Sequence, residues 1–242
     1  MKTLDFTFPT PEENLACDEA LLDLCERGCS DEILRFWRPK RHFIVLGLSN
    51  SAPTELHLPA AQARSIPILR RCSGGGTVLQ GPGCLNFALI LRIEKPGPLE
   101  SIGSTNRHIL EHHREALEKL LHRKVSVQGC TDLTLDGLKF SGNSQRRRMR
   151  SLLFHGTFLL HLNLTLMEEL LAIPSRQPTY RRGRSHGRFL THLPLSADPI
   201  KEALRETWGA NGVAGPPPGE EIRRLVDSRY SREDWNLRTI LP

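Results

Sequence analysis

Apolar and polar positions along the chain follow two different periods, and these predict where helices and strands lie. Leucines recur at helical spacing over residues 11–27 and 105–122, which is typical of helices with one buried face. The histidines of the second helix, at positions 108, 112, 113 and 122, alternate with charged residues and are expected on its solvated face. The first helix opens with the capping box Thr10-Pro11-Glu12-Glu13 and is terminated by Gly28. Shorter apolar runs bounded by turn-forming residues predict strands. These strands are expected at residues 33–37, 43–46, 66–71, 85–91, 125–127, 133–135, 138–140 and 152–162.

Three further helices and a proline-rich connector complete the pattern. The helices are expected at residues 164–173, 199–210 and 220–229, and the connector at 214–219. Strands outnumber helices in the middle of the chain, and the turn Asp136-Gly137 predicts a tight hairpin there. The regular strand–helix alternation of a doubly wound fold is absent. We therefore predict one α+β domain over residues 1–242, with a mixed, largely antiparallel sheet flanked by helices, in which residues 214–242 can form a small appendage.

Composition and charge indicate the class of partner that the protein binds and the cellular compartment in which we expect it. The chain has 242 residues, a net charge of +6 and a pI of about 9.2, which favours an anionic partner such as a nucleotide, an acidic protein or a nucleic acid. The N-terminus has no apolar stretch of a secretory signal, and no apolar run approaches the ~20 residues needed to span a bilayer. The six cysteines are not spaced as a disulfide framework. We expect a cytoplasmic protein with reduced thiols and no membrane partner.

A glycine-rich stretch is the first candidate for chemistry. Arg70 and Arg71 close an apolar run, three glycines follow at 74–76, and a new strand starts at Thr77. Glycine allows a ligand to approach the backbone closely, and arginine offers a planar cationic fork to phosphate or carboxylate. A flexible hairpin with solvated arginines is the alternative interpretation.

Two further stretches carry candidate residues. Lys139 lies on a short strand whose apolar neighbours point the other way, and small residues follow it at 141–143. A compact ammonium there can stabilise charge on a phosphoryl oxygen, although a solvated edge-strand lysine gives the same pattern. Gly156, inside the last long strand, indicates close approach of a ligand or another backbone. Its neighbour His155 is either part of that site or a satisfied core histidine.

Several classes of site are excluded by their missing motifs. The chain contains no P-loop, and its glycines lead into a strand rather than the helix of a dinucleotide fingerprint. It also contains no HExxH zinc motif and no GxSxG nucleophile elbow. Cys17, Cys25 and Cys29 have no histidine beside them, so we expect no metal site made by protein ligands alone.

Taken together, four stretches resemble the lipoate–protein ligase A family of the biotin/lipoate A/B protein ligase superfamily. They are Arg-Arg-x-Ser-Gly-Gly-Gly-x-Val at 70–78, Gly-x-Leu-Asn-Phe at 83–87, Thr-Asp-Leu with Leu-Lys-Phe-Ser-Gly-Asn within 131–143, and His-Gly-Thr at 155–157. Residues 14–19, 35–37 with 45–47, and 228–230 with 235–236 are similar to further segments of the family, so the resemblance covers nearly the whole chain. It implies a fold related to biotin ligases and class II aminoacyl-tRNA synthetases. It also implies ATP, Mg²⁺ bound with the nucleotide, lipoate as substrate, and a lipoyl-domain or other acceptor protein as partner.

The resemblance also implies roles for individual residues, with Lys139 as the catalytic one. The implied ATP-binding residues are Arg71, Gly76, Thr77, Val78, Leu79 and Lys139. The implied lipoate-binding residues are Ser73, Gly74, Gly75, Lys139, Ser141, Gly142, His155 and Gly156. Asn86, Asp132, Asn143 and Thr157 are further candidates.

Three alternatives stay open. Longer members of the family carry a C-terminal accessory domain that we expect to be absent here, so that a separate chain can supply it. Octanoyltransferases of the same superfamily use a cysteine thioester without ATP, but neither Cys72 nor Cys130 lies where we expect that nucleophile. The basic runs 145–150 and 181–188 suit a non-catalytic nucleic-acid-binding module or the docking of an acidic acceptor. We favour a ligase without a nucleic-acid partner.

Overall fold

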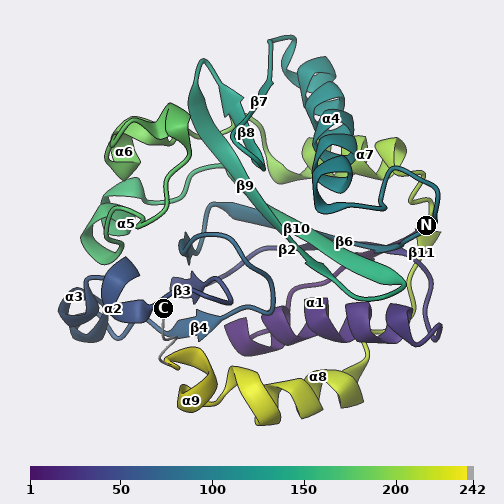
Figure 1. Cartoon of the computed structure of the whole chain (residues 1–242), viewed down its shortest axis with the longest axis horizontal. Coiled ribbons are helices and arrows are strands. Elements are labelled where there is room, and N and C mark those ends of the chain that lie inside the picture. The colour runs from purple at the N-terminus through teal and green to yellow at the C-terminus, as the bar shows by residue number, and fades with distance from the viewer. Residues whose placement is uncertain (239–242) are drawn as a thin grey trace.

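The computed structural model describes residues 1–238, and an eight-stranded sheet forms its centre (Figure 1). Its strands, in spatial order, are β11 (Gly212–Val213), β1 (Lys2–Asp5), β2 (Ile33–Trp37), β6 (Cys84–Arg92), β10 (Ser151–Leu159), β9 (Leu138–Arg147), β8 (Asp132–Leu135) and β7 (Ser126–Gln128). All neighbours from β2 to β7 pair antiparallel, whereas β1 runs parallel to both β2 and β11. The predicted mixed, largely antiparallel sheet is confirmed.

A second, three-stranded sheet lies beside the large one. Its order is β4 (Ile68–Arg70), β3 (Phe43–Leu46) and β5 (Val78–Gln80), with β3 parallel to β4 and antiparallel to β5. All four residues of the central strand β3 are buried, as expected for a continuous apolar run. The glycines predicted to form a turn connect β4 to β5.

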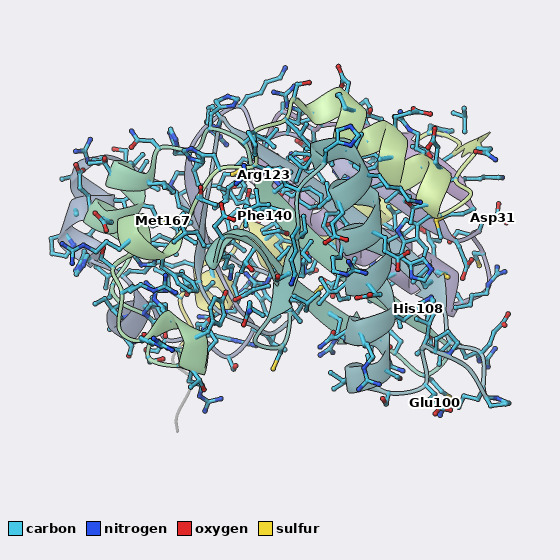
Figure 2. All side chains as sticks on the ribbon, turned by 90° about the horizontal axis from the view of Figure 1, so that it is seen from above. Asp31, Glu100, His108, Arg123, Phe140 and Met167 are labelled. Carbon is cyan, nitrogen blue, oxygen red and sulfur yellow. The ribbon has the colours of Figure 1, made fainter. Side chains whose placement is uncertain are left out.

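Helices cover both faces of the large sheet and the outside of the small one (Figure 1). They are α1 (Pro11–Glu26), α2 (Ala52–Glu55), α3 (Leu58–Ala63), α4 (Ile102–Leu121), α5 (Leu164–Leu170), α6 (His186–Phe189), α7 (Ala197–Thr207), α8 (Gly219–Leu225) and α9 (Glu233–Asn236), with the single turns η1 (Thr179–Arg181) and η2 (Val226–Tyr230). The helices α4 and α7 lie side by side on one face (Figure 2), and α1 and α8 pack together on the other. No helix within residues 1–238 has both the length and the apolar composition needed to cross a membrane.

Three apolar clusters stabilise these layers. One lies between the large sheet and α4 and α7, and includes Phe87, Phe140 and Phe154. The second joins α1 to the opposite face and takes in Ile222 and Tyr230 from the C-terminal segment. The third fills the space between the small sheet and the helices α2, α3, α5 and α6. Residues 219–230 therefore pack on the main body through α1.

Two strands differ from the sequence prediction in ways that matter for function. Strand β9 runs over Leu138–Arg147, far beyond the predicted 138–140, because its polar residues hydrogen-bond to β10 despite lacking an alternating pattern. The alternative interpretation of Lys139 as a solvated edge-strand lysine is wrong, since β9 lies between β10 and β8. The short strand β1 was not predicted at all.

Candidate active site

A cavity of about 1060 Å³ lies where the two sheets meet, beside the segment 174–181. Its lining combines apolar side chains, such as Trp37, Val45 and Phe189, with a smaller number of polar and charged groups. Sites for small molecules typically have this composition, in which apolar walls hold the ligand and a few polar groups orient it.

One register row of the large sheet forms the floor of the cavity. Trp37 pairs with Asn86, Asn86 with Thr157, Thr157 with Gly142 and Gly142 with Asp132, so five adjacent strands each contribute one residue. Residues of one row project from the same face of a sheet, and all five line the cavity. Gly142 leaves space for the Lys139 side chain, because a Cβ at position 142 would lie only 2.7 Å from the Lys139 Nζ.

A β-bulge brings Lys139 to the same side as this row. Lys139 and Ser141 face the adjacent residues Thr134 and Leu133 of β8, so that β9 carries one extra residue, Phe140. A bulge of this kind redirects side chains: Phe140 packs in the core behind the sheet while Lys139 lines the cavity. The Lys139 Nζ lies 2.8 Å from the Asp132 carboxylate, and the lysine side chain is 25% exposed.

Arg71 fixes the shape of the glycine turn. Its guanidinium donates to the carbonyl oxygens of Gly74 at 2.6 Å and Gly76 at 2.8 Å, and to the Ser73 hydroxyl at 3.0 Å. Burial lowers the pKa of Arg71 to about 10, so the side chain remains charged at neutral pH. Gly75 takes a φ of +84°, which glycine adopts without strain. The turn and the Arg71 charge both face the cavity.

Arg70 has a structural role instead. It is fully buried and donates to the backbone oxygens of Gly47, Leu48 and Asn50, and to that of Trp235. These contacts fasten the loop after β3, which lines the cavity, to the C-terminal segment. Of the two neighbouring arginines, only Arg71 reaches the cavity.

A chain of polar side chains lies behind the glycine turn. The Ser73 Oγ is 2.5 Å from the His155 Nε2, and the His155 Nδ1 is 3.4 Å from Asp18. Asp18 also forms a buried ion pair with Arg35. His155 and Asp18 line the cavity, whereas Ser73 is fully buried behind them.

A second polar group forms a closed ring of hydrogen bonds on the floor. Gln80 donates to Thr157 at 2.8 Å, Thr157 to Asn86 at 2.5 Å, and Asn86 back to Gln80 at 3.0 Å. The ring ties β5 of the small sheet to β6 and β10 of the large one. It therefore fixes the distance between the two walls of the cavity.

Most residues singled out from the sequence come together here, although they derive from distant parts of the chain. Those lining the cavity are Arg71, Gly75, Gly76, Thr77, Val78, Leu79, Asn86, Asp132, Lys139, Gly142, Asn143, His155, Gly156 and Thr157. Three others do not line it. Ser73 and Ser141 are fully buried, and the Gly74 carbonyl oxygen accepts hydrogen bonds from Arg71 and Ser144.

The two cysteines considered as nucleophiles have opposite environments. Cys72 is buried, and this burial raises the pKa of its thiol well above the usual value, which makes it unreactive. Cys130 is exposed and lines the same cavity as Lys139. The structure therefore brings to the cavity a cysteine that the sequence did not place there.

Several lining residues were missed as individual candidates. Asp18, Trp37 and Gln80 reach the cavity from α1, β2 and β5. Asp18 and Trp37 belong to stretches, at 14–19 and 35–37, that already resemble the family. Gln80 follows two apolar residues of the strand after the glycines, and no local pattern distinguishes it from a surface glutamine.

Two arginines of the first basic run have partners within the protein. Arg147 donates to the Thr105 hydroxyl at 3.0 Å, and Arg148 pairs with Asp23 at 2.8 Å.

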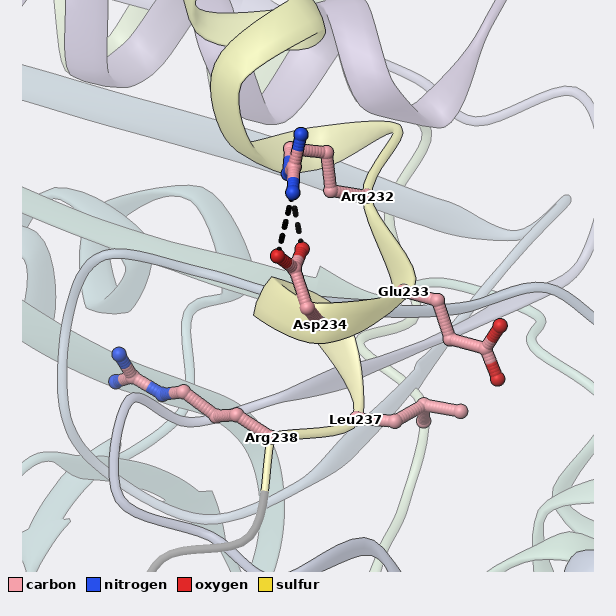
Figure 3. A pocket seen from close by; sticks show the side chains of 5 residues that line it. All are labelled: Arg232, Glu233, Asp234, Leu237 and Arg238. Atoms are coloured by element: carbon pink, nitrogen blue, oxygen red, sulfur yellow. Dashed lines mark hydrogen bonds and ion pairs between the residues drawn. The ribbon is translucent and has the colours of Figure 1, made fainter.

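A shallow hollow elsewhere is lined by Arg232, Glu233, Asp234, Leu237 and Arg238, and it shares no lining residue with the cavity (Figure 3). All five of these residues come from one short stretch, and Arg232 is already paired with Asp234 at 2.6 Å. The cavity between the sheets is therefore the candidate site.

Comparison with known proteins gives the family of the chain. Residues 10–203 match the family described as the lipoyl protein ligase A/B catalytic domain. The chain is 25% identical to octanoyltransferase LipM of Brevibacillus brevis, over 95% of each protein. It is also 25% identical to lipoate-protein ligase A subunit 1 of Thermoplasma acidophilum, over 93% of this chain and 91% of that protein.

A solved structure shares the fold over the whole chain. The bipartite lipoate protein ligase of Thermoplasma acidophilum aligns with a TM-score of 0.82 and 24% identity, covering 100% of this chain and 97% of that one. At this identity the likeness concerns the fold. The two sequence relatives carry the names of different reactions, an acyl transfer and a ligation, so the reaction has to be argued from the site.

Proposed function

Because the chain belongs to the lipoyl protein ligase A/B catalytic domain family, we propose that it is a lipoate–protein ligase. It would activate lipoate with ATP to lipoyl-adenylate and transfer the acyl group to a lysine of an acceptor protein. The observation that carries the proposal is the convergence of two cations, Arg71 and Lys139, with a glycine turn in one cavity. Cations of this kind bind the phosphates of a nucleotide and the carboxylate of an acid.

In the first step, a carboxylate oxygen of lipoate attacks the α-phosphorus of ATP, and pyrophosphate leaves. Negative charge increases on the phosphoryl oxygens as this bond forms. The Lys139 ammonium, held by the Asp132 carboxylate at 2.8 Å, is oriented before the reaction begins. Such preorganised charge stabilises the transition state more than the ground state.

In the second step, the ε-amine of an acceptor lysine attacks the acyl carbonyl, and AMP leaves. The same ammonium polarises that carbonyl. The solved bipartite ligase is paired with a lipoyl domain, and we propose a lipoyl domain as the acceptor here. A second chain as accessory subunit is part of the same proposal.

Mg²⁺ would enter with the nucleotide phosphates. Both oxygens of Asp132 are already engaged, one in an ion pair with Lys139 and the other as acceptor of the Tyr180 hydroxyl. Within residues 1–238, no group of three or more His, Cys, Asp or Glu side chains gathers as a metal site. The protein residues present therefore suit a metal ion bound by the substrate rather than by the chain.

The test is incubation with ATP and lipoate, followed by mass spectrometry of the small molecules and of an added lipoyl domain. We expect lipoyl-adenylate and a lipoylated domain. Adenylate without transfer would support a separate accessory chain, and adding candidate chains should then restore transfer. Absence of adenylate would refute the ligase proposal.

A second candidate reaction is favoured by Cys130. This exposed thiol lines the cavity with Lys139, and the similarity to LipM supports the same chemistry. An octanoyltransferase would accept octanoate from a carrier thioester onto the Cys130 sulfur and pass it to the acceptor lysine, without ATP.

The substitution Cys130→Ser separates the two reactions. A ligase should retain adenylate formation and transfer, because neither step needs a thiol. A transferase should lose all transfer, and the wild-type protein should then yield an octanoyl thioester on Cys130 when octanoyl carrier protein is supplied without ATP.

A further inference from the structure

One tyrosine connects the arginine-rich segment 172–191 to the carboxylate that holds Lys139. The Tyr180 hydroxyl donates to the Oδ2 of Asp132 at 2.7 Å, while the Oδ1 of Asp132 forms an ion pair with the Lys139 Nζ at 2.8 Å. Asp132 is only 7% exposed. A single buried carboxylate is thus shared between a tyrosine and the proposed catalytic lysine.

The backbone around Tyr180 is held against the same strands. Thr191, at the far end of the segment, donates its backbone N–H to the Lys139 carbonyl at 2.9 Å. A Cβ at Gly129 would lie 3.2 Å from Pro178 and 3.5 Å from the Tyr180 ring, so the loop before β8 is in close contact with this segment. The tyrosine hydroxyl is therefore directed at Asp132 by packing on two sides.

The chemistry of this hydroxyl suits a permanent donor. Burial, together with the Asp132 carboxylate, raises the pKa of Tyr180 above its usual value, so the O–H stays protonated. When Lys139 turns its N–H groups toward substrate oxygens, the Asp132 carboxylate loses part of the positive charge that balances its own charge. A buried carboxylate without a donor is costly, and the Tyr180 hydroxyl is the donor that remains.

We propose that Tyr180 is a positioning residue for Lys139 that acts through Asp132. It stabilises the Asp132 carboxylate while Lys139 exchanges this partner for the reacting oxygens. The inference rests on the proposed function only in that it takes Lys139 as the catalytic residue. Without the hydroxyl, Lys139 is the sole side-chain donor described for this carboxylate, and the lysine is held back from the substrate.

The chain offers a matched pair of variants, because it contains two tyrosines. Tyr180→Phe removes the hydroxyl that binds Asp132. Tyr230→Phe removes a hydroxyl that also donates to a carboxylate at 2.7 Å, but this one is Glu19, which does not line the cavity. The measurements are single-turnover pyrophosphate release, calorimetric affinities for ATP and lipoate, and melting temperature.

We expect Tyr180→Phe to slow adenylate formation roughly 10-fold or more, the scale of one hydrogen bond to a charged group, with both affinities unchanged. Tyr230→Phe should lower the melting temperature and leave the rate alone. In an Asp132→Asn background, Tyr180→Phe should have little further effect, because the carboxylate through which it acts is gone.

Three results would overturn the inference: a wild-type rate in Tyr180→Phe, a loss caused entirely by weaker substrate binding, or an equal further loss in the Asp132→Asn background. A wild-type protein that forms no adenylate would refute the ligase proposal separately. The same variants would then be compared in acyl transfer from octanoyl carrier protein, and an unchanged transfer rate in Tyr180→Phe would overturn the inference there.

Discussion

At the scale of single residues, the candidate site depends on charged groups that are buried and partly paired before any substrate binds. Lys139 forms an ion pair with Asp132, and Arg71 donates to the carbonyls of the glycine turn. His155 contacts the side chains of Ser73 and Asp18. Pairing of this kind holds each side chain close to its working position before a substrate binds.

Lys139→Ala should lower adenylate formation by roughly 10²-fold or more, on the scale of removing one preorganised electrostatic donor. Lys139→Arg should not restore it, because a planar fork does not fit where Gly142 leaves room only for a compact ammonium. Pyrophosphate release with lipoate measures the effect, and circular dichroism checks the fold. A folded Lys139→Ala protein with the wild-type rate would show that the lysine serves only as a partner of Asp132.

Arg71→Ala should weaken ATP binding by about 1.5–3 kcal/mol, the range for a charge-assisted hydrogen bond. The variant loses a cation in the cavity and also the two contacts that hold the turn carbonyls. Calorimetry with ATP measures the affinity. Arg148→Ala serves as the control, because Arg148 pairs with Asp23 and does not line the cavity. Equal ATP affinity in Arg71→Ala and the wild type would show that Arg71 does not take part in ATP binding.

At the scale of elements, the sequence predicts the main strands and helices well but not the bulge that orients the proposed catalytic lysine, Lys139. Capping residues place α1 within one residue of its observed end, and the glycine turn connects two strands as expected. The bulge at Phe140 inserts one residue into β9. Strict alternation would put Lys139 and Gly142 on opposite faces of the sheet, and no local signal marks the exception.

The close approach of two turns supplies an element-level prediction. A Cβ at Gly47 would lie 2.1 Å from the Gly75 carbonyl oxygen, and this backbone atom cannot move without displacing the glycine turn. Gly47→Ala should therefore cost about 1–3 kcal/mol of stability, as overpacking does, and should weaken ATP binding.

The measurements are the melting temperature and ATP calorimetry. Gly103→Ala, in helix α4 with no atom within 4 Å of the added Cβ, is the control and should retain the wild-type ATP affinity with a melting temperature no lower than that of the wild type. Wild-type stability and affinity in Gly47→Ala would show that the two turns separate freely.

At the scale of the whole molecule, the cavity exists because two sheets and a C-terminal segment meet. The ring of Gln80, Asn86 and Thr157 spans the sheets, and Arg70 joins the cavity loop to Trp235. Contacts between residues 70 and 235 leave no periodic trace in a sequence. Residue patterns therefore indicated most of the side chains that gather at the cavity, whereas the partners of Arg70 and Gln80 required the structure.

The packing of α4 and α7 on the large sheet also buries a histidine that the sequence suggested was solvated. His113 is fully buried, its Nε2 accepts from the Trp208 indole at 3.0 Å, and its ring lies edge-on to Phe87. The prediction of a solvated histidine face on this helix is wrong for His113, because it lies one position beyond His112 and turns toward the sheet.

This buried imidazole predicts how stability depends on pH. Burial lowers the pKa of His113 to about 3, while the unfolded chain has a value of about 6.5. Between these values the unfolded state binds a proton that the folded state does not, so stability falls as the pH falls below about 6.5. The limiting slope is about 1.4 kcal/mol per pH unit, or about 2 kcal/mol between pH 6.5 and 5. Urea unfolding at pH 7 and pH 5 measures the slope.

His113→Gln, which cannot titrate and keeps an acceptor for Trp208, should reduce this slope, whereas His57→Gln at an exposed position should not. An unchanged slope in His113→Gln would assign the acid sensitivity to other groups.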